Sequence, residues 1–163
     1  MSVTDALIIG AGPFGLSISA HLHDLGVDHV IVGRTMDTWR THMPAGMNLK
    51  SEPYASVIAS PKRGSDIAAY SAAHGLDYVD RVGPLPLTQF LGYADWFAEK
   101  FVPDVRDLTV TKVTADGDEF KVEFAEAEPI GNSAPCGHDP VLGWGCRFQN
   151  SGRSRQARVA DPA

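Results

Sequence analysis

The residues with the clearest chemical potential form a glycine-rich turn near the N-terminus. Residues 10–15 read GAGPFG and follow the apolar run ALII. In this G-x-G-x-x-G pattern, Gly10 permits a tight turn, Gly12 lets a pyrophosphate approach the backbone, and Gly15 lets a helix pack against a sheet. The amides and the dipole at the start of the following helix attract phosphate. The spacing therefore predicts a site for the phosphates of a dinucleotide.

The elements around this turn predict a β-α-β unit over residues 5–33. Residues 6–9 are fully apolar, which is typical of a buried parallel strand. A helix is expected to follow and to end near Gly26, and residues 29–32 (HVIV) predict the second strand. About 30 residues is the length that such a unit requires. This context favours a nucleotide site over the alternative, a glycine-rich turn without a ligand.

One residue type that such a site usually contains is missing. An acidic residue that binds ribose is expected about 20 positions after the turn. Gly33 occupies that place, and Arg34 follows it. Arg34 is a candidate ligand for ribose or phosphate, and an exposed loop arginine is the alternative interpretation.

The following residues predict two helices and a β-hairpin. Residues 65–75 predict a short helix with Ser65 as its N-cap, and Thr88 is expected to cap an amphipathic helix. Residues 108–113 and 120–124 predict strands that a turn at the sequence ADGD joins. Parallel strands are expected at residues 5–10, 29–33 and 108–113. The predicted fold class is therefore α/β, a partial Rossmann-like domain with added helices and a β-hairpin.

The composition narrows the classes of function. The 163 residues carry a formal net charge of −6, which argues against a nucleic-acid partner. No apolar run approaches the ~18 residues that span a bilayer, and no signal peptide is recognised, so we expect a cytoplasmic protein without a membrane partner. Cys136, His138 and Cys146 do not form a zinc pattern, so we expect no metal site.

The character of the chain changes after residue 130. Residues 131–163 contain four Arg and no Lys, and no period of two or 3.6 residues persists there. Such a composition is typical of disordered sequence. We therefore expect a folded domain at residues 1–130 and a disordered tail at residues 131–163.

The chain resembles the flavin-dependent monooxygenases and related FAD/NAD(P)-dependent oxidoreductases. The resemblance rests on GAGPFG with Pro13, on MDTWR at residues 36–40 followed by HMPAGMNLKSEP, and on PLTQFLGYADWFAEKFVPDV before the hairpin. It covers about residues 3–128 and lies in the order of these segments more than in any one motif. It implies an FAD-binding domain of an enzyme that uses NADPH and oxygen on a small-molecule substrate.

The resemblance also implies roles for individual residues, in four groups. These are Gly10, Gly12, Pro13, Phe14 and Gly15 for the FAD pyrophosphate; Trp39 and Arg40 against the cofactor; Leu49, Lys50 and Ser51 near the flavin ring or substrate channel; and the backbone of Val113 for adenine. A core aromatic is the alternative interpretation of Trp39, and a solvated loop residue is the alternative for Lys50. No catalytic acid, base or nucleophile is predicted.

The sequence departs from the family pattern after residue 128. There the family continues with a buried strand that ends in an A-T-G-like turn, and then with a second glycine fingerprint for NADPH. Neither follows here, so we expect a truncated chain, inactive alone, and hypothesise a disrupted reading frame near Glu128 to Gly131. Two alternatives stay open: a non-catalytic nucleotide-binding remnant, and an NAD-dependent dehydrogenase domain, which the missing ribose carboxylate disfavours.

Overall fold

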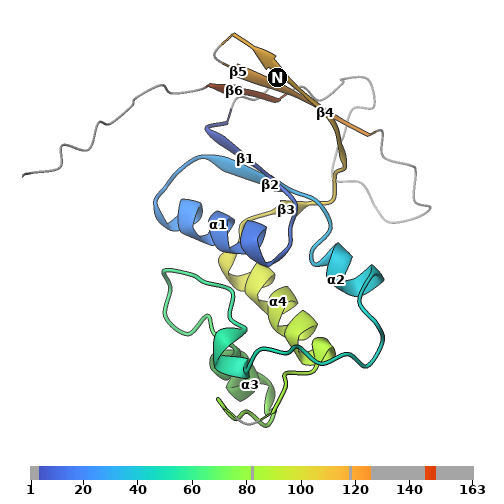
Figure 1. Cartoon of the computed structure of the whole chain (residues 1–163). Helices are drawn as coiled ribbons and strands as arrows, with labels where there is room; N and C mark the ends of the chain where they lie inside the picture. Colours follow the sequence, from blue (N-terminus) through green and yellow to red (C-terminus); the bar gives the residue numbers. More distant parts are fainter. Residues whose placement is uncertain (1–3, 82, 118, 126–145, 150–163) are drawn as a thin grey trace, which may run out of the picture.

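The computed structural model describes residues 4–81, 83–117, 119–125 and 146–149. These residues form two three-stranded sheets, with the helices below the first of them in the view of Figure 1. The first sheet is parallel, and its strands are β1 (Ala6–Ile9), β2 (His29–Val32) and β3 (Val105–Arg106), in that order. The second is antiparallel, and its strands are β4 (Val110–Asp116), β5 (Glu119–Phe124) and β6 (Cys146–Gln149). The predicted α/β class, with a parallel sheet and a hairpin, is confirmed.

The third parallel strand differs from the prediction. Strand β3 pairs with β2 through Ile31 opposite Val105, whereas residues 110–116 form β4 and pair antiparallel with β5. The prediction of a parallel strand at residues 108–113 is therefore wrong. A strand of two residues has no detectable period, and its pairing depends on a partner more than 70 residues away in the chain.

Helix α1 (Pro13–Asp24) begins and ends as its sequence predicts. Pro13 occupies the first helical turn, where a missing amide hydrogen costs nothing. At the other end, Gly26 has a φ of 67°, and the Val27 amide donates to the Leu22 carbonyl at 3.0 Å. This is a Schellman C-terminus, which satisfies carbonyls that would otherwise lack a partner. The helix thereby presents its first turn to the carboxyl end of β1.

Helix α3 (Ile67–His74) forms where expected, but with another N-cap. The Asp66 side chain accepts the Ala69 amide hydrogen at 2.8 Å, while the Ser65 hydroxyl donates to the Lys62 carbonyl. Ser and Asp are both strong capping residues, so two adjacent candidates cannot be ranked by residue type. The prediction of Ser65 as the cap is wrong.

Helix α4 (Leu87–Phe101) also lacks its predicted cap. The helix begins at Leu87, after Pro86, and no side chain caps it, so Thr88 lies within the first turn. The amphipathic pattern is confirmed, because Phe90, Tyr93 and Phe97 are buried. Each buried aromatic side chain contributes roughly 1.5–3 kcal/mol relative to an exposed one. This face joins Leu16 of α1 and Ile31 of β2 in one core beneath the parallel sheet.

Two short elements and one strand complete the described chain. Helix α2 (Asp37–Thr41) follows β2, and a 3-10 turn, η1 (Pro53–Ala55), precedes α3. Strand β6 lies within residues 131–163, where no regular element was expected, and it pairs with β5. The other residues of that predicted tail, and the predicted frame change near residues 128–131, lie outside the described residues. None of the described helices has the length and apolar character needed to cross a membrane.

Candidate functional site

A cleft of about 680 Å³ lies at the carboxyl ends of β1 and β2. Its walls are residues 9–12, 32–34, 36–39 and 108–110. They come from the glycine turn, the end of β2, helix α2 and the link from β3 into β4. In open parallel α/β sheets, ligands bind outside the carboxyl ends of the strands. The cleft therefore lies where this type of fold binds its ligands.

The three glycines of the turn have the geometry that the motif predicts. Gly10 has a φ of 106°, and its amide donates to the Val32 carbonyl at 2.8 Å, which holds the turn against β2. A Cβ on Gly15 would collide with the Gly10 carbonyl oxygen, so only glycine lets α1 approach β1 this closely. A Cβ on Gly12 would meet no protein atom within 4 Å, because this glycine faces open space.

The start of α1 fits an anionic group. The Leu16 amide donates to the Gly12 carbonyl at 2.9 Å, which begins the helical hydrogen bonds. The amides before it, including those of Phe14 and Gly15, have no partner within the helix. No side chain caps this end, and its first turn contains no acidic residue. Free amides, a helix dipole and open space beside Gly12 together match the requirements of a pyrophosphate.

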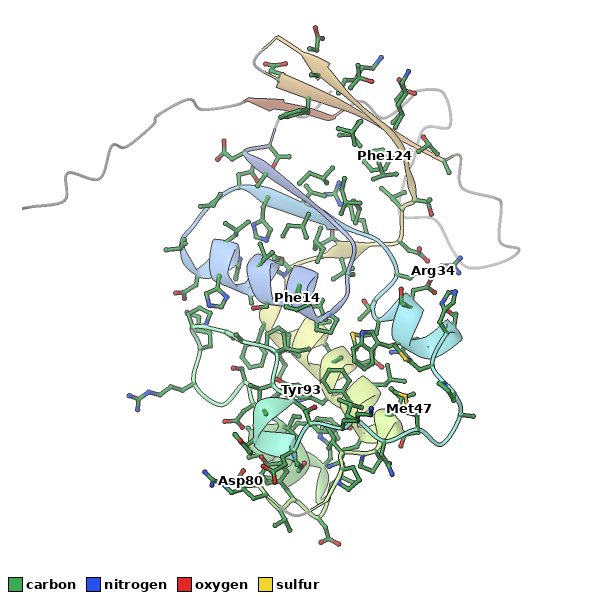
Figure 2. The ribbon with its side chains drawn as sticks, viewed as in Figure 1. Phe14, Arg34, Met47, Asp80, Tyr93 and Phe124 are labelled. Atoms are coloured by element: carbon green, nitrogen blue, oxygen red, sulfur yellow. The ribbon has the colours of Figure 1, made fainter. Side chains whose placement is uncertain are left out.

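The end of β2 explains why the usual ribose carboxylate is missing. Gly33 has a φ of 125°, and a Cβ there would lie 3.3 Å from both the Ala11 nitrogen and the Gly10 Cα. An acidic side chain at this position would be strained and crowded. Arg34 follows Gly33 (Figure 2). The Arg34 Nε lies 3.4 Å from Asp107 Oδ1, and the two side chains are 68% and 67% exposed. Such an exposed pair contributes about 0–1 kcal/mol, so the guanidinium is weakly held.

Met36 fixes helix α2 against the glycine turn. Its amide donates to the Ala11 carbonyl at 3.0 Å, and its side chain is fully buried. It adopts a φ of 58°, which is uncommon for a residue other than glycine. Residues held in such backbone conformations cluster at ligand sites. The next turn places Trp39 at the cleft, where its ring also packs on Phe90 with centroids 5.1 Å apart.

Four of the predicted site residues line the cleft: Gly10, Gly12, Arg34 and Trp39. Pro13, Phe14 and Gly15 do not line it, but they form the first turn of α1 beside Gly12. Phe14 is 86% exposed at this end of the helix (Figure 2).

The other predicted residues lie outside the lining of the cleft. Arg40 pairs with Asp95 at 2.5 Å, and Leu49 is buried with its amide bonded to the Leu85 carbonyl. Lys50 is exposed. The Ser51 hydroxyl bonds that of Ser56 at 2.7 Å. Val113 lies on β4 opposite Val122, and its side chain is exposed. Their roles toward a cofactor stay predictions.

Sequence reasoning missed two parts of the cleft. Asp37 lines the cleft, and it is the only acidic residue between His29 and Ser51. Because Gly33 has no carboxylate, this fact alone could have pointed to Asp37. Residues 108–110 carry no motif, and only the tertiary fold brings them to the cleft.

Other chemistry is not apparent in the described part of the chain. It contains no group of three His, Cys, Asp or Glu side chains that could hold a metal ion. Cys136 and His138 lie outside the described residues. Burial raises the pKa of both Tyr78 and Tyr93 to about 12, but neither residue lines the cleft.

Comparison with known proteins agrees with this geometry. Residues 3–51, which contain the glycine turn, β2 and α2, match the family described as FAD binding domain. None of the curated proteins matches the chain in sequence.

Solved structures share the fold at low sequence identity. A flavin-containing monooxygenase from Stenotrophomonas maltophilia matches 91% of this chain with a TM-score of 0.64 and 19% identity. An FAD-bound cadaverine monooxygenase from Erwinia amylovora matches 91% with a TM-score of 0.63 and 18% identity. A bacillithiol disulfide reductase from Staphylococcus aureus matches 78% with a TM-score of 0.62 and 18% identity. The chain covers 37%, 34% and 35% of these three proteins, respectively. The predicted resemblance to FAD-dependent oxidoreductases is confirmed, and the fold is that of part of an FAD-binding Rossmann-like domain.

Proposed function

We propose that the cleft binds FAD and that the chain supplies the FAD-binding part of a flavin-dependent oxidoreductase of the monooxygenase type. The observation that carries this proposal is the glycine turn. Its second glycine faces open space beside uncapped helix amides, at the cleft where the parallel strands end. The match of residues 3–51 to an FAD binding domain supports FAD over other dinucleotides.

The use of NADPH and oxygen belongs to the same proposal and rests on the resemblance. Among the described residues, one glycine turn joins a parallel strand to a helix, and we assign that turn to FAD. Binding of NADPH would then need residues outside the described part or a second polypeptide, and we expect the chain alone to be inactive. We propose a small-molecule substrate on the same basis. We also propose a cytoplasmic location, as expected from the sequence.

The role of the cleft can be tested by substituting Gly12. Gly12 has a φ of −81° and a ψ of −175°, which alanine adopts freely, and the new methyl group would meet no protein atom. It would instead occupy space that a pyrophosphate needs. We expect Gly12→Ala to weaken FAD binding at least ~10-fold in calorimetric titration without lowering the free energy of unfolding, which a compatible glycine-to-alanine change raises by up to about 1 kcal/mol.

The control variant is Ser17→Ala, one turn further along α1, which should bind FAD like the wild-type chain. Riboflavin, which lacks phosphate, serves as the control ligand and should bind more weakly than FAD. The proposal would be refuted by equal affinities for FAD and riboflavin, or by unchanged FAD affinity in Gly12→Ala.

A further inference from the structure

We infer that Asp37 supplies the ribose contact that Gly33 cannot make, and that it selects nucleotides with a free 2′-hydroxyl over 2′-phosphorylated ones. This inference rests on the proposed function, because it concerns the adenosine end of the same cleft. It assigns the specificity of the cleft to a residue four positions beyond the usual one.

The usual position is closed to a carboxylate by the backbone. Gly33 has a φ of 125°, and any Cβ there would press against the Ala11 nitrogen and the Gly10 Cα at 3.3 Å. Either contact could be relieved only by moving the glycine turn. A ribose ligand must therefore come from another wall of the cleft.

Asp37 lies on such a wall and is held there by its backbone. Its amide donates to the Arg34 carbonyl at 3.3 Å, and its carbonyl accepts from the Thr41 hydroxyl at 2.8 Å. The preceding residue, Met36, is hydrogen-bonded to Ala11 of the glycine turn. The side chain of Asp37 is half-buried, and it makes no hydrogen bond or ion pair with any other described residue. Its carboxylate can therefore accept hydrogen bonds from hydroxyl groups of a ligand.

The charges around the cleft favour a hydroxyl over a phosphate at this place. Of the residues that line the cleft, Arg34 and Asp37 are charged. Arg34 is already paired with Asp107, which precedes the lining residues 108–110. Arg34 is exposed and shares its charge with Asp107, whereas Asp37 is half-buried and has no ion-pair partner among the described residues. A 2′-phosphate beside Asp37 would therefore meet a negative charge that no neighbouring cation offsets. The pyrophosphate of the ligand would bind elsewhere, at the free amides that begin α1, so its charge does not bear on this choice.

The test uses the whole chain and calorimetric titration with defined nucleotides. ADP should bind the wild-type chain about 10- to 100-fold more tightly than 2′-deoxy-ADP, since a hydrogen bond to a charged acceptor is lost. ADP-ribose should likewise bind more tightly than 2′-phospho-ADP-ribose. In Asp37→Ala, the affinities within each pair of ligands should differ by less than ~3-fold. Asp116→Ala, at the far end of β4, makes the same change in charge and should keep the wild-type preferences.

Each outcome decides between the two proposals. Wild-type protein that binds FAD but does not distinguish ADP from 2′-deoxy-ADP would overturn the role of Asp37 and leave the proposed function intact. So would an Asp37→Ala variant that retains both ratios. Wild-type protein that binds neither FAD nor ADP would overturn both. Should Asp37→Ala fail to fold, Asp37→Asn removes the charge but keeps an acceptor, so it should reduce mainly the preference for ADP-ribose over 2′-phospho-ADP-ribose. The comparison of ligands on wild-type protein remains decisive.

Discussion

At the scale of single residues, the glycine turn contains two positions with opposite consequences for substitution. Gly12 borders open space at the cleft, whereas Gly15 packs directly against the carbonyl of Gly10, just after β1. The first position is thus expected to govern binding, and the second to govern stability.

Substitution of Gly15 tests this distinction. Alanine at a helical position normally stabilises a helix by about 1 kcal/mol relative to glycine. Here the collision with the Gly10 carbonyl should outweigh that gain, and we expect Gly15→Ala to lower the free energy of unfolding by about 1–3 kcal/mol. Urea unfolding measures the change, with Gly12→Ala as the matched control. A more stable Gly15→Ala would show that α1 can shift away from β1 at little cost.

At the scale of elements, one hydroxyl on α4 connects the helix to the preceding loop. The Tyr93 hydroxyl donates to the Ser65 carbonyl at 2.7 Å and accepts from the Ile58 amide at 3.0 Å (Figure 2). The ring is fully buried, and its burial is the main reason that its pKa rises to about 12. The loop before α3 is therefore held by a group that must stay protonated.

Phenylalanine at this position should act on both stability and its pH dependence. Tyr93→Phe leaves a buried amide and carbonyl without their partner, so we expect a loss of about 1–3 kcal/mol at neutral pH. In wild-type protein, the pKa of this tyrosine is near 10 in the unfolded chain and about 12 in the folded one. The stabilisation by the protonated hydroxyl is therefore complete below pH 10 and is lost as the pH rises toward 12.

Urea unfolding at pH 9 and pH 11 checks this expectation. The difference in stability between the two pH values should be smaller in Tyr93→Phe than in the wild-type chain. Tyr54→Phe provides the control, because Tyr54 is exposed beside Arg81. Tyr78 also has its pKa raised to about 12, by burial and by its hydrogen bond to Asp80, so some pH dependence should persist in every variant. Equal pH dependence in wild-type and Tyr93→Phe protein would contradict the assignment.

At the scale of the whole molecule, the described parallel sheet has only three strands, so it covers little of the apolar core beneath it. Strand β1 is at one edge of the described sheet, and Ile9, Phe14 and Ile18 nearby are exposed. Open edges and exposed apolar side chains reduce the stability of an isolated domain. We therefore expect a modest melting temperature that depends on the ligand.

Thermal unfolding with FAD measures this dependence. FAD at 100 times its dissociation constant should stabilise the chain by about 2.7 kcal/mol, which raises the melting temperature by about 5–10 °C for a chain of this size. Gly12→Ala protein at the same FAD concentration should show a clearly smaller rise. A high melting temperature that FAD leaves unchanged would contradict both the marginal stability and the binding site.

The features that sequence predicts well here depend on local pattern. The glycine turn, β1, α1, β2 and the hairpin each consist of neighbouring residues whose types and period determine their structure. The predictions failed where the choice depended on distant partners. Val105 becomes a strand residue because Ile31 lies beside it, and Leu108 lines the cleft because the chain leaves β3 at that point.

The predicted site shows the same division. Gly10 and Gly12 could be predicted from their own motif, and Trp39 from the order of segments. Asp37 could not be predicted from the customary spacing of a ribose carboxylate, which points to Gly33 instead. The crowding at Gly33, which only the structure shows, explains why that spacing fails.

The link between the two sheets has a further consequence. Residues 108–110 leave the parallel sheet, enter the antiparallel one and form a wall of the cleft on the way. A molecule that touches both walls would contact both sheets, and its affinity would then be linked to their relative orientation. Linkage is reciprocal: if occupancy favours one orientation by a certain factor, any change that favours that orientation raises affinity by the same factor. Of the described hairpin residues, Val110 alone lines the cleft, so any such linkage would pass through the start of β4.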